Sequence, residues 1–140
     1  MKRIATIALI AGLAGTTAIA EQHTMNTDEL IRARDIVDSD IYSIGTEMDD
    51  ASWDAMDLST NDDGWTEIGE VEDVVLDQSG QMVGIVAEIG GFLDIGDKHV
   101  MLEVGDVRLS PRGDGEYIFV TRQTEEQLEE LPSVDESFME

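Results

Sequence analysis

The residues whose spacing is most suggestive of metal ligation lie in the segment 59–70. Aligned with a twelve-residue calcium-binding loop, this segment places Asn61 at the third position, Asp63 at the fifth and Glu70 at the bidentate last position. The first position holds Ser59 in place of aspartate, and the residues that follow are typical of a strand rather than a helix. The pattern therefore argues against an EF-hand. It leaves weak loop binding of Ca²⁺ by Asn61, Asp63 and Glu67 as the metal-site hypothesis.

Histidine and cysteine, which carry much of enzyme and metal chemistry, are scarce. The chain contains two histidines, His23 and His99, and no cysteine, which leaves little for a zinc or copper site. A nucleophile needs an activating base, commonly histidine, within hydrogen-bond reach. His23 lies in a polar N-terminal stretch, and His99 follows Lys98 at an expected strand start, where a surface or core-edge role is typical. The sequence also lacks a Gly-x-Ser-x-Gly motif, a phosphate loop and a dinucleotide fingerprint. We therefore predict that the protein is not an enzyme and needs no cofactor besides the weak Ca²⁺ site.

The chain is strongly acidic. Its 140 residues include 32 Asp and Glu against 8 Lys and Arg, which gives a formal net charge of −24. Such a surface repels nucleic acid and anionic lipid, so we expect neither as a partner. Solubility in a salty medium and cation binding both account for the charge. The spread of acids along the whole chain favours the first explanation.

The first twenty residues have the composition of a secretory signal. Lys2 and Arg3 precede an uncharged apolar run over residues 4–14, and Ala18 and Ala20 put small side chains at the cleavage positions. The run is interrupted by glycine and falls short of the roughly 20 strongly apolar residues that a membrane span needs, which favours a cleaved signal over an anchor. We expect cleavage after Ala20, a mature chain without a membrane span, and a periplasmic or secreted location. Without cysteine, the exported fold would be held by its core alone.

Downstream of the signal, the pattern predicts short strands joined by glycine-containing turns. The β-prone runs cover residues 41–44, 68–76, 82–89, 99–104, 106–110 and 116–121, with turns at 77–80 and 111–115. Capping residues predict two helices. The first begins at Asn26 or Thr27, and the second begins at a Thr124–Gln127 capping box and ends at Pro132. Five or six short strands at this spacing indicate a small barrel or sandwich.

Residues 46–66 have a different character from their surroundings. Seven acids and no base lie between Glu47 and Asp63, with Trp53, Met56 and Leu58 interleaved. The segment is either a solvated loop or a short amphipathic helix whose apolar side rests on the domain, and the spacing of the apolar residues suits the helix.

Several of these segments together resemble the PRC-barrel family. Residues 68–77 (Ile-Gly-Glu-Val-Glu-Asp-Val-Val-Leu-Asp) resemble its opening hairpin strand, and residues 80–86 resemble its second strand. The glycine-rich stretch 90–100 (Gly-Gly-Phe-Leu-Asp-Ile-Gly-Asp-Lys-His-Val) is similar to the family's most recognisable part, and residues 124–132 are similar to its usual ending. The resemblance covers residues 36–134, and the acidic insertion 46–66 departs from it.

This resemblance implies a mainly β fold: a small PRC-type β-barrel of five or six short strands, with a short C-terminal helix and an N-terminal helical or loop extension. The expected organisation is a signal peptide at 1–20, an extension at 21–35, the barrel-like domain at 36–134 and a tail at 135–140.

The resemblance also implies a non-catalytic adaptor that docks on other proteins or on itself, with no shared catalytic residues. In the glycine-rich loop, Phe92, Leu93 and Ile95 either plug an end of the barrel or form an exposed partner surface. We predict a periplasmic protein-binding or self-associating module whose partner the sequence does not name. The alternative function is a cation-binding or envelope stress protein that acts through residues 46–66.

Overall fold

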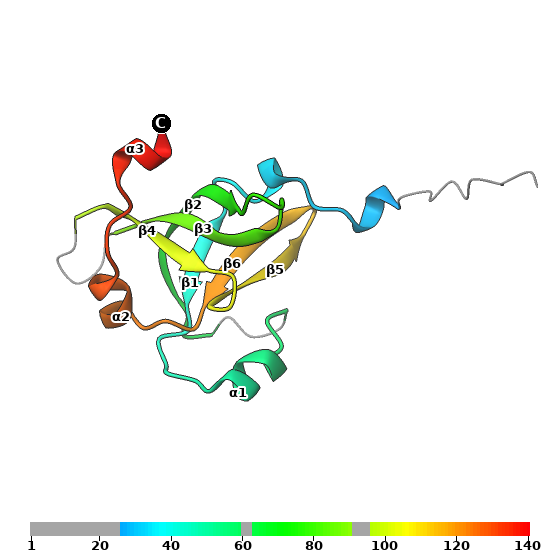
Figure 1. Ribbon diagram of the computed structural model, residues 1–140. Coiled ribbons are helices and arrows are strands. Elements are labelled where there is room, and N and C mark those ends of the chain that lie inside the picture. The colour runs from blue at the N-terminus through cyan, green and yellow to red at the C-terminus, as the bar shows by residue number, and fades with distance from the viewer. Residues whose placement is uncertain (1–25, 60–62, 91–95) are drawn as a thin grey trace, which may run out of the picture. The chain divides into compact units, whose positions relative to one another are not determined.

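The computed structural model describes residues 26–59, 63–90 and 96–140 (Figure 1). The described chain divides into two units, with the boundary between Leu30 and Ile31. In the first unit, Thr27–Glu29 form a single 3₁₀ turn, and the side chain of Asn26 caps it by accepting from the Asp28 amide at 3.3 Å. In the second unit, Ala33–Asp35 form another 3₁₀ turn. Asn26 therefore caps a helical turn as predicted, but the helix expected to follow it does not form, and two separate 3₁₀ turns take its place.

The second unit is built on one six-stranded sheet. Its strands are β1 (Asp40–Ser43), β2 (Thr66–Leu76), β3 (Met82–Ile89), β4 (Lys98–Glu103), β5 (Val107–Gly113) and β6 (Glu116–Thr121). Their order is β4-β3-β2-β1-β6-β5, with β1 and β6 parallel and every other pair antiparallel. This confirms the mainly β fold with six strands. The edge strands β4 and β5 follow each other in the chain, and no pairing between them closes the sheet in the part that the structure describes.

The β2–β3 pair contains two β-bulges that curve the sheet. β2 pairs with β1 through its first half and with β3 along most of its length. Its register with β3 shifts between Val71 and Asp73, where Glu72 of β2 is the extra residue, and again between Val75 and Leu76, where the extra residue is Val83 of β3. Each extra residue bends the strand and increases its twist. At Gly69, a Cβ atom would lie 1.9 Å from the carbonyl oxygen of Glu88, so only glycine allows β3 to approach this closely.

The main hydrophobic core lies on the inner, concave side of the sheet. It is formed by aliphatic side chains from β1 to β4 together with Val107 and Phe119, all of which are less than 5% exposed. The helix α2 (Glu125–Glu130) contributes Leu128, which is fully buried in the same core. The predicted capping box of α2 is confirmed, because Thr124 and Gln127 each accept the other's backbone amide. The ammonium group of Lys98 caps the other end of α2 by donating to the carbonyls of Glu129 and Leu131.

The acidic insertion forms a helix that covers a second core. The helix α1 (Asp50–Ala55) places Trp53, 2% exposed, and the following Leu58, 5% exposed, against Ile118 and Val120 of β6. Of the two interpretations of this segment, the amphipathic helix resting on the domain is therefore correct.

Two features follow α2 that the sequence pattern did not indicate. Ser133 forms an isolated bridge with Val100, and the Val134 amide donates to the His99 carbonyl at 2.8 Å, so this segment lies along the outer edge of β4. A short helix α3 (Glu136–Met139) then begins at Asp135, which accepts from the Ser137 amide. No helix within the described residues combines the length and apolar character needed to cross a membrane.

Candidate functional site

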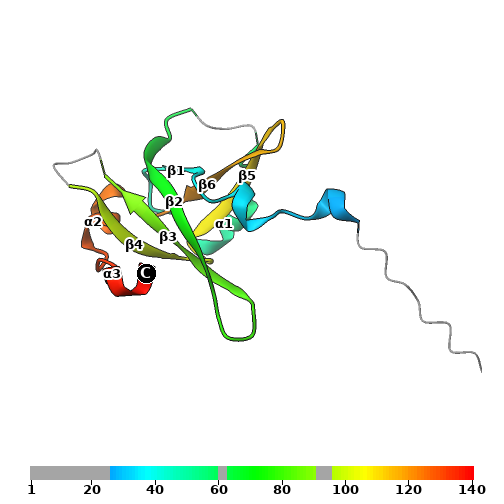
Figure 2. The same cartoon turned by 90° about the horizontal axis from the view of Figure 1, so that it is seen from above.

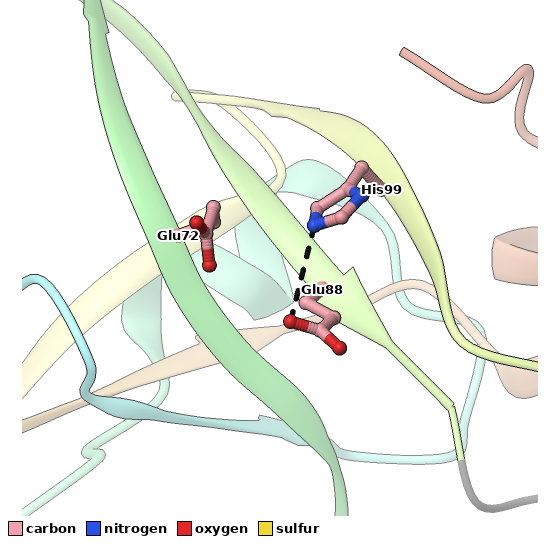
Figure 3. A group of neighbouring side chains, drawn as sticks. All are labelled: Glu72, Glu88 and His99. Carbon is pink, nitrogen blue, oxygen red and sulfur yellow. Dashed lines mark ion pairs between the residues drawn. The ribbon is translucent and has the colours of Figure 1, made fainter. Parts of the chain in front are cut away.

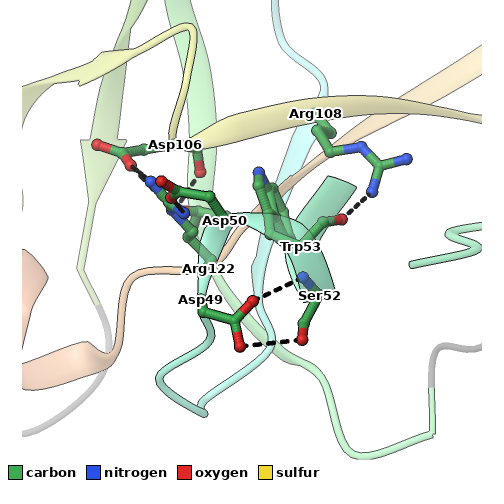
Figure 4. A network of polar contacts seen from close by, with 8 residues as sticks. Asp49, Asp50, Ser52, Trp53, Asp106, Arg108 and Arg122 are labelled. Atoms are coloured by element: carbon green, nitrogen blue, oxygen red, sulfur yellow. Dashed lines mark hydrogen bonds and ion pairs between the residues drawn. The ribbon is translucent and has the colours of Figure 1, made fainter. Parts of the chain in front are cut away.

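The insertion is fixed to the sheet by an arginine of β5 (Figure 4). The guanidinium carbon of Arg108 lies 5.3 Å from the centre of the Trp53 ring. Its Nη1 donates to the carbonyl oxygens of Trp53 at 2.6 Å and Met56 at 3.0 Å, at the end of α1. The Trp53 carbonyl also accepts from the Met56 amide at 3.2 Å, so Arg108 adds a second hydrogen bond to the last turn of the helix. The buried hydroxyl of Ser110 donates to the Leu58 carbonyl at 3.1 Å. These contacts satisfy the backbone of the insertion, so its role at this face is structural.

A second arginine holds the beginning of α1. Arg122 donates to Asp50 of α1 and to Asp106 in the β4–β5 turn, and Figure 4 shows both carboxylates converging on it. The hydrogen bonds to Asp50 and then to Asp106 raise the pKa of Arg122 above its ordinary value. Asp49 caps α1 by accepting from the Ser52 amide and hydroxyl, and these hydrogen bonds lower the pKa of its carboxyl group.

A hollow of about 600 Å³ lies beside this network. Its lining consists of Glu47, Met48, Asp49, Asp50, Asp106, Arg122, Gln123 and Gln127. Arg122 supplies the basic group in this lining, and two carboxylates already neutralise it. The hollow therefore offers neither a free cation for an anionic ligand nor a nucleophile paired with a base.

Three side chains of types that can bind a metal meet on the outer side of β2, β3 and β4 (Figure 3). Glu88 and His99 are register partners on adjacent strands, and the Nε2 atom of His99 lies 3.8 Å from Oε2 of Glu88. The third member, Glu72, lies at the β2 bulge, and donor atoms of all three residues lie within 4.8 Å of one another. We call this group the Glu72/Glu88/His99 cluster.

The sequence does not predict this cluster, because no local motif encodes it. Its members lie on three different strands, and only the strand register and the bulge bring them together. The available signal was the alternation of side chains along β3 and β4. In β3, the residues before and after Glu88, Ala87 and Ile89, both face the core. In β4, Val100, the residue after His99, also faces the core. Because successive side chains of a strand point to opposite faces, Glu88 and His99 lie together on the outer face.

A group of exposed apolar side chains marks one end of the sheet. Leu76, Val83 and Val104 are 55%, 41% and 51% exposed. Leu76 pairs with Met82, the neighbour of Val83, and the Val104 amide donates to the Val83 carbonyl at 3.0 Å, so the three residues lie at the same end of β2, β3 and β4. Figure 2 shows the β2–β3 hairpin projecting beyond the other strands at this end. We call Leu76, Val83 and Val104 the hairpin-end patch.

The sequence-predicted site residues are only partly described. Phe92, Leu93 and Ile95, the expected plug or partner loop, lie outside the described residues, as does Asn61 of the expected calcium loop. Asp63 and Glu67 are both exposed, and Glu67 accepts from the Tyr42 hydroxyl at 3.4 Å. Burial, followed by the charges of Glu67 and Asp40, raises the pKa of Tyr42. Both predicted sites therefore stay predictions.

Comparison with known proteins gives one result about the family. The model of the PRC-barrel domain family matches residues 28–126, which is most of the chain and includes the acidic insertion. A search of curated proteins found no match. The matched region contains the whole six-stranded sheet, α1 and the Glu72/Glu88/His99 cluster.

Proposed function

Because the chain belongs to the PRC-barrel domain family, whose members are commonly non-catalytic modules, we propose that it is an exported adaptor that binds another protein. The expected secretory signal at residues 1–20 supports a periplasmic or secreted site of action. The observation that carries the proposal is the hairpin-end patch, an exposed apolar group on a chain with a net charge of −24.

Exposed apolar groups on small soluble domains frequently mark partner surfaces, since their burial against another protein is favourable by roughly 25 cal/mol per Å². The charge of the chain bears on the kind of partner. Two copies, each carrying −24, repel each other, whereas a neutral or basic protein does not. We therefore favour a different protein, with an apolar surface bordered by basic residues, over a second copy of this chain.

The use of the buried hydroxyl groups supports a non-catalytic role. The buried polar residues of the described chain are Ser43, Ser110 and Thr121. Each donates its hydroxyl proton to a backbone carbonyl, those of Gln123, Leu58 and Asp106 respectively. A serine or threonine nucleophile is instead activated by a neighbouring base. These hydroxyls therefore serve the fold.

The partner hypothesis is tested by capture from an envelope extract with three forms of the protein. These are the wild type, the double variant Leu76→Gln with Val83→Thr, and the control Phe138→Gln, which removes another exposed apolar side chain, 55% exposed, from α3. We expect a protein retained by the wild type and the control to be lost with the double variant. Identical retention by all three forms contradicts the role of the patch.

Two further measurements separate the remaining parts of the proposal. Light scattering at high micromolar concentration is expected to give a monomer, and a dimer that the double variant abolishes would identify a second copy as the partner. Intact mass of protein recovered from the periplasm of a bacterial host is expected to correspond to a chain that begins at Glu21. An unprocessed chain in the cytoplasm would contradict export.

A further inference from the structure

The Glu72/Glu88/His99 cluster combines one imidazole and two carboxylates at a single point on the sheet surface. We propose that this cluster is a binding site for a divalent transition-metal ion, with Zn²⁺ as its best probe. The inference is independent of the adaptor function and of the calcium loop predicted from the sequence. It differs from the sequence-based expectation that two histidines and no cysteine leave little for a zinc or copper site.

The backbone under the cluster is fixed, which favours binding. Glu88 lies on β3 between its two sheet neighbours, and β4 carries His99 directly opposite. The carbonyl of His99 also accepts the Val134 amide from the C-terminal segment, so the His99 backbone is held from that segment as well as from β3. Ligands that project from a rigid sheet lose less freedom on binding than ligands on a loop.

The bulge in β2 supplies the third ligand. Val71 and Val74 both pack against the inner core, and two residues, Glu72 and Asp73, lie between them where regular alternation allows one. Figure 3 shows the Glu72 side chain between β2 and β3, and one of its carboxylate oxygens lies within 4.8 Å of a donor atom of Glu88 and of His99. Without the extra residue, the alternation that buries Val71 would not also bury Val74.

The distances suit a small ion. Ligand atoms about 2.0–2.1 Å from a tetrahedral Zn²⁺ lie about 3.3 Å apart. The Nε2–Oε2 separation of 3.8 Å between His99 and Glu88 needs only a small side-chain rotation to reach this value. Both of these side chains are 37% exposed, so an ion can enter and water can fill the remaining coordination position.

The donor set also indicates which ions bind. Imidazole is a good ligand for Zn²⁺, Cu²⁺ and Ni²⁺, whereas Ca²⁺ and Mg²⁺ prefer oxygen ligands and more of them. The neighbouring cation does not compete, because the ammonium of Lys98 is engaged with the carbonyls of Glu129 and Leu131 at the end of α2. The site should therefore select transition metals over the alkaline-earth ions.

The composition of the cluster distinguishes it from carboxylates that lie close together by chance. The chain has 32 acidic residues, and chance would bring carboxylates together at many places. Within the described residues, however, this is the only place where ligand atoms of three such side chains lie within 4.8 Å of one another, and one of the three is a histidine. Two carboxylates on β2 and β3 and an imidazole on β4 form a donor set of defined chemistry.

The test is Zn²⁺ titration by calorimetry, with thermal unfolding in parallel, on the purified wild-type protein and three variants. His99→Gln removes the imidazole, His23→Gln removes the other histidine of the chain, and Glu116→Gln removes an exposed acid from the start of β6. We expect one Zn²⁺ ion per chain and a raised unfolding midpoint for the wild type, His23→Gln and Glu116→Gln. In His99→Gln the affinity should fall by about tenfold or more.

Three results would overturn the proposal: no Zn²⁺ binding by the wild type at millimolar concentration, equal binding by His99→Gln, or loss of binding in His23→Gln. Unfolding without metal shows whether His99→Gln is folded. The double variant Glu72→Gln with Glu88→Gln, which keeps both histidines, should lose affinity as well.

Discussion

Arg108 binds both the side chain and the backbone of Trp53: its guanidinium lies 5.3 Å from the centre of the indole ring and donates to the Trp53 carbonyl at 2.6 Å. A guanidinium over an aromatic face is attracted by the ring quadrupole, and the hydrogen bond fixes its orientation. One residue of β5 thus couples the sheet to α1. The acidic insertion is therefore a structural part of the domain.

Replacing Trp53 by alanine is expected to destabilise the protein by about 3–5 kcal/mol, because the indole is the largest buried side chain of the core under α1. Denaturant unfolding followed by circular dichroism measures the loss. The control is Leu76→Ala, which truncates a side chain that is 55% exposed and should cost well under half as much. Equal losses in the two variants would mean that α1 does not depend on its tryptophan.

Arg122→Gln is expected to lower the unfolding midpoint, because it leaves Asp50 and Asp106 close together without their shared cation. The decrease should become smaller as salt is added, since salt screens the repulsion between the carboxylates. Arg34→Gln, at an exposed position, removes the same charge from the same acidic chain and is the matched control. A midpoint for Arg122→Gln no lower than that of Arg34→Gln would show that the network adds nothing to stability.

Asp77 gives the β2–β3 turn a pH dependence. Its Oδ1 accepts from the Ser79 hydroxyl and from the amides of Ser79 and Gln81, and these hydrogen bonds, led by that of the hydroxyl, lower the pKa of the carboxyl group. A lowered folded-state pKa gives stability that is complete above the unfolded-state value of about 3.9 and is lost as the pH falls through the folded-state value.

The difference in unfolding midpoint between wild type and Asp77→Asn should therefore be largest from about pH 5 upward and should shrink as the pH falls below about 4. Asp54→Asn, at an exposed position in α1, controls for the change in total charge. If the difference stays constant down to pH 3, the ionised carboxylate of Asp77 does not stabilise this turn.

The predicted calcium loop is tested by thermal unfolding in Ca²⁺ and in Mg²⁺ at equal ionic strength. Binding by Asn61, Asp63 and Glu67 predicts a slightly larger rise in the midpoint with Ca²⁺, because only a ligand specific to the folded state adds to the effect of screening. Glu67→Gln should remove this excess and Glu116→Gln should keep it. Equal midpoints in the two ions would reject the loop.

Much of the fold follows from local patterns. The bounds of β3 and β6 agree with the predicted runs 82–89 and 116–121, because each is a run rich in apolar residues that follows a glycine-containing turn. The turn expected at 111–115 is shorter than predicted. Pro111 and Arg112 continue β5, since proline is tolerated in an edge strand, and the chain reverses at Asp114 and Gly115, both with positive φ.

The parts that the sequence did not predict depend on contacts between distant segments. The bridge from Ser133 to Val100 needs the end of α2 to be placed beside β4, and no periodicity in residues 133–140 announces it. The Glu72/Glu88/His99 cluster depends on a one-residue bulge, which changes the register without leaving a signature in composition. Whether a segment forms a strand depends mostly on its own residues, whereas its register depends on the partner strand as well.

The segment that follows α2 has a consequence for self-aggregation. An open six-stranded sheet presents two edges, and an unpaired edge is a template on which strands of other molecules can add. The Ser133 bridge and the Val134 amide occupy part of the β4 edge, while Pro111 deprives β5 of an amide donor. Ser133 and Val134 thus block part of the β4 edge from pairing with another strand. A chain shortened before Ser133 would expose that edge to strands of neighbouring molecules.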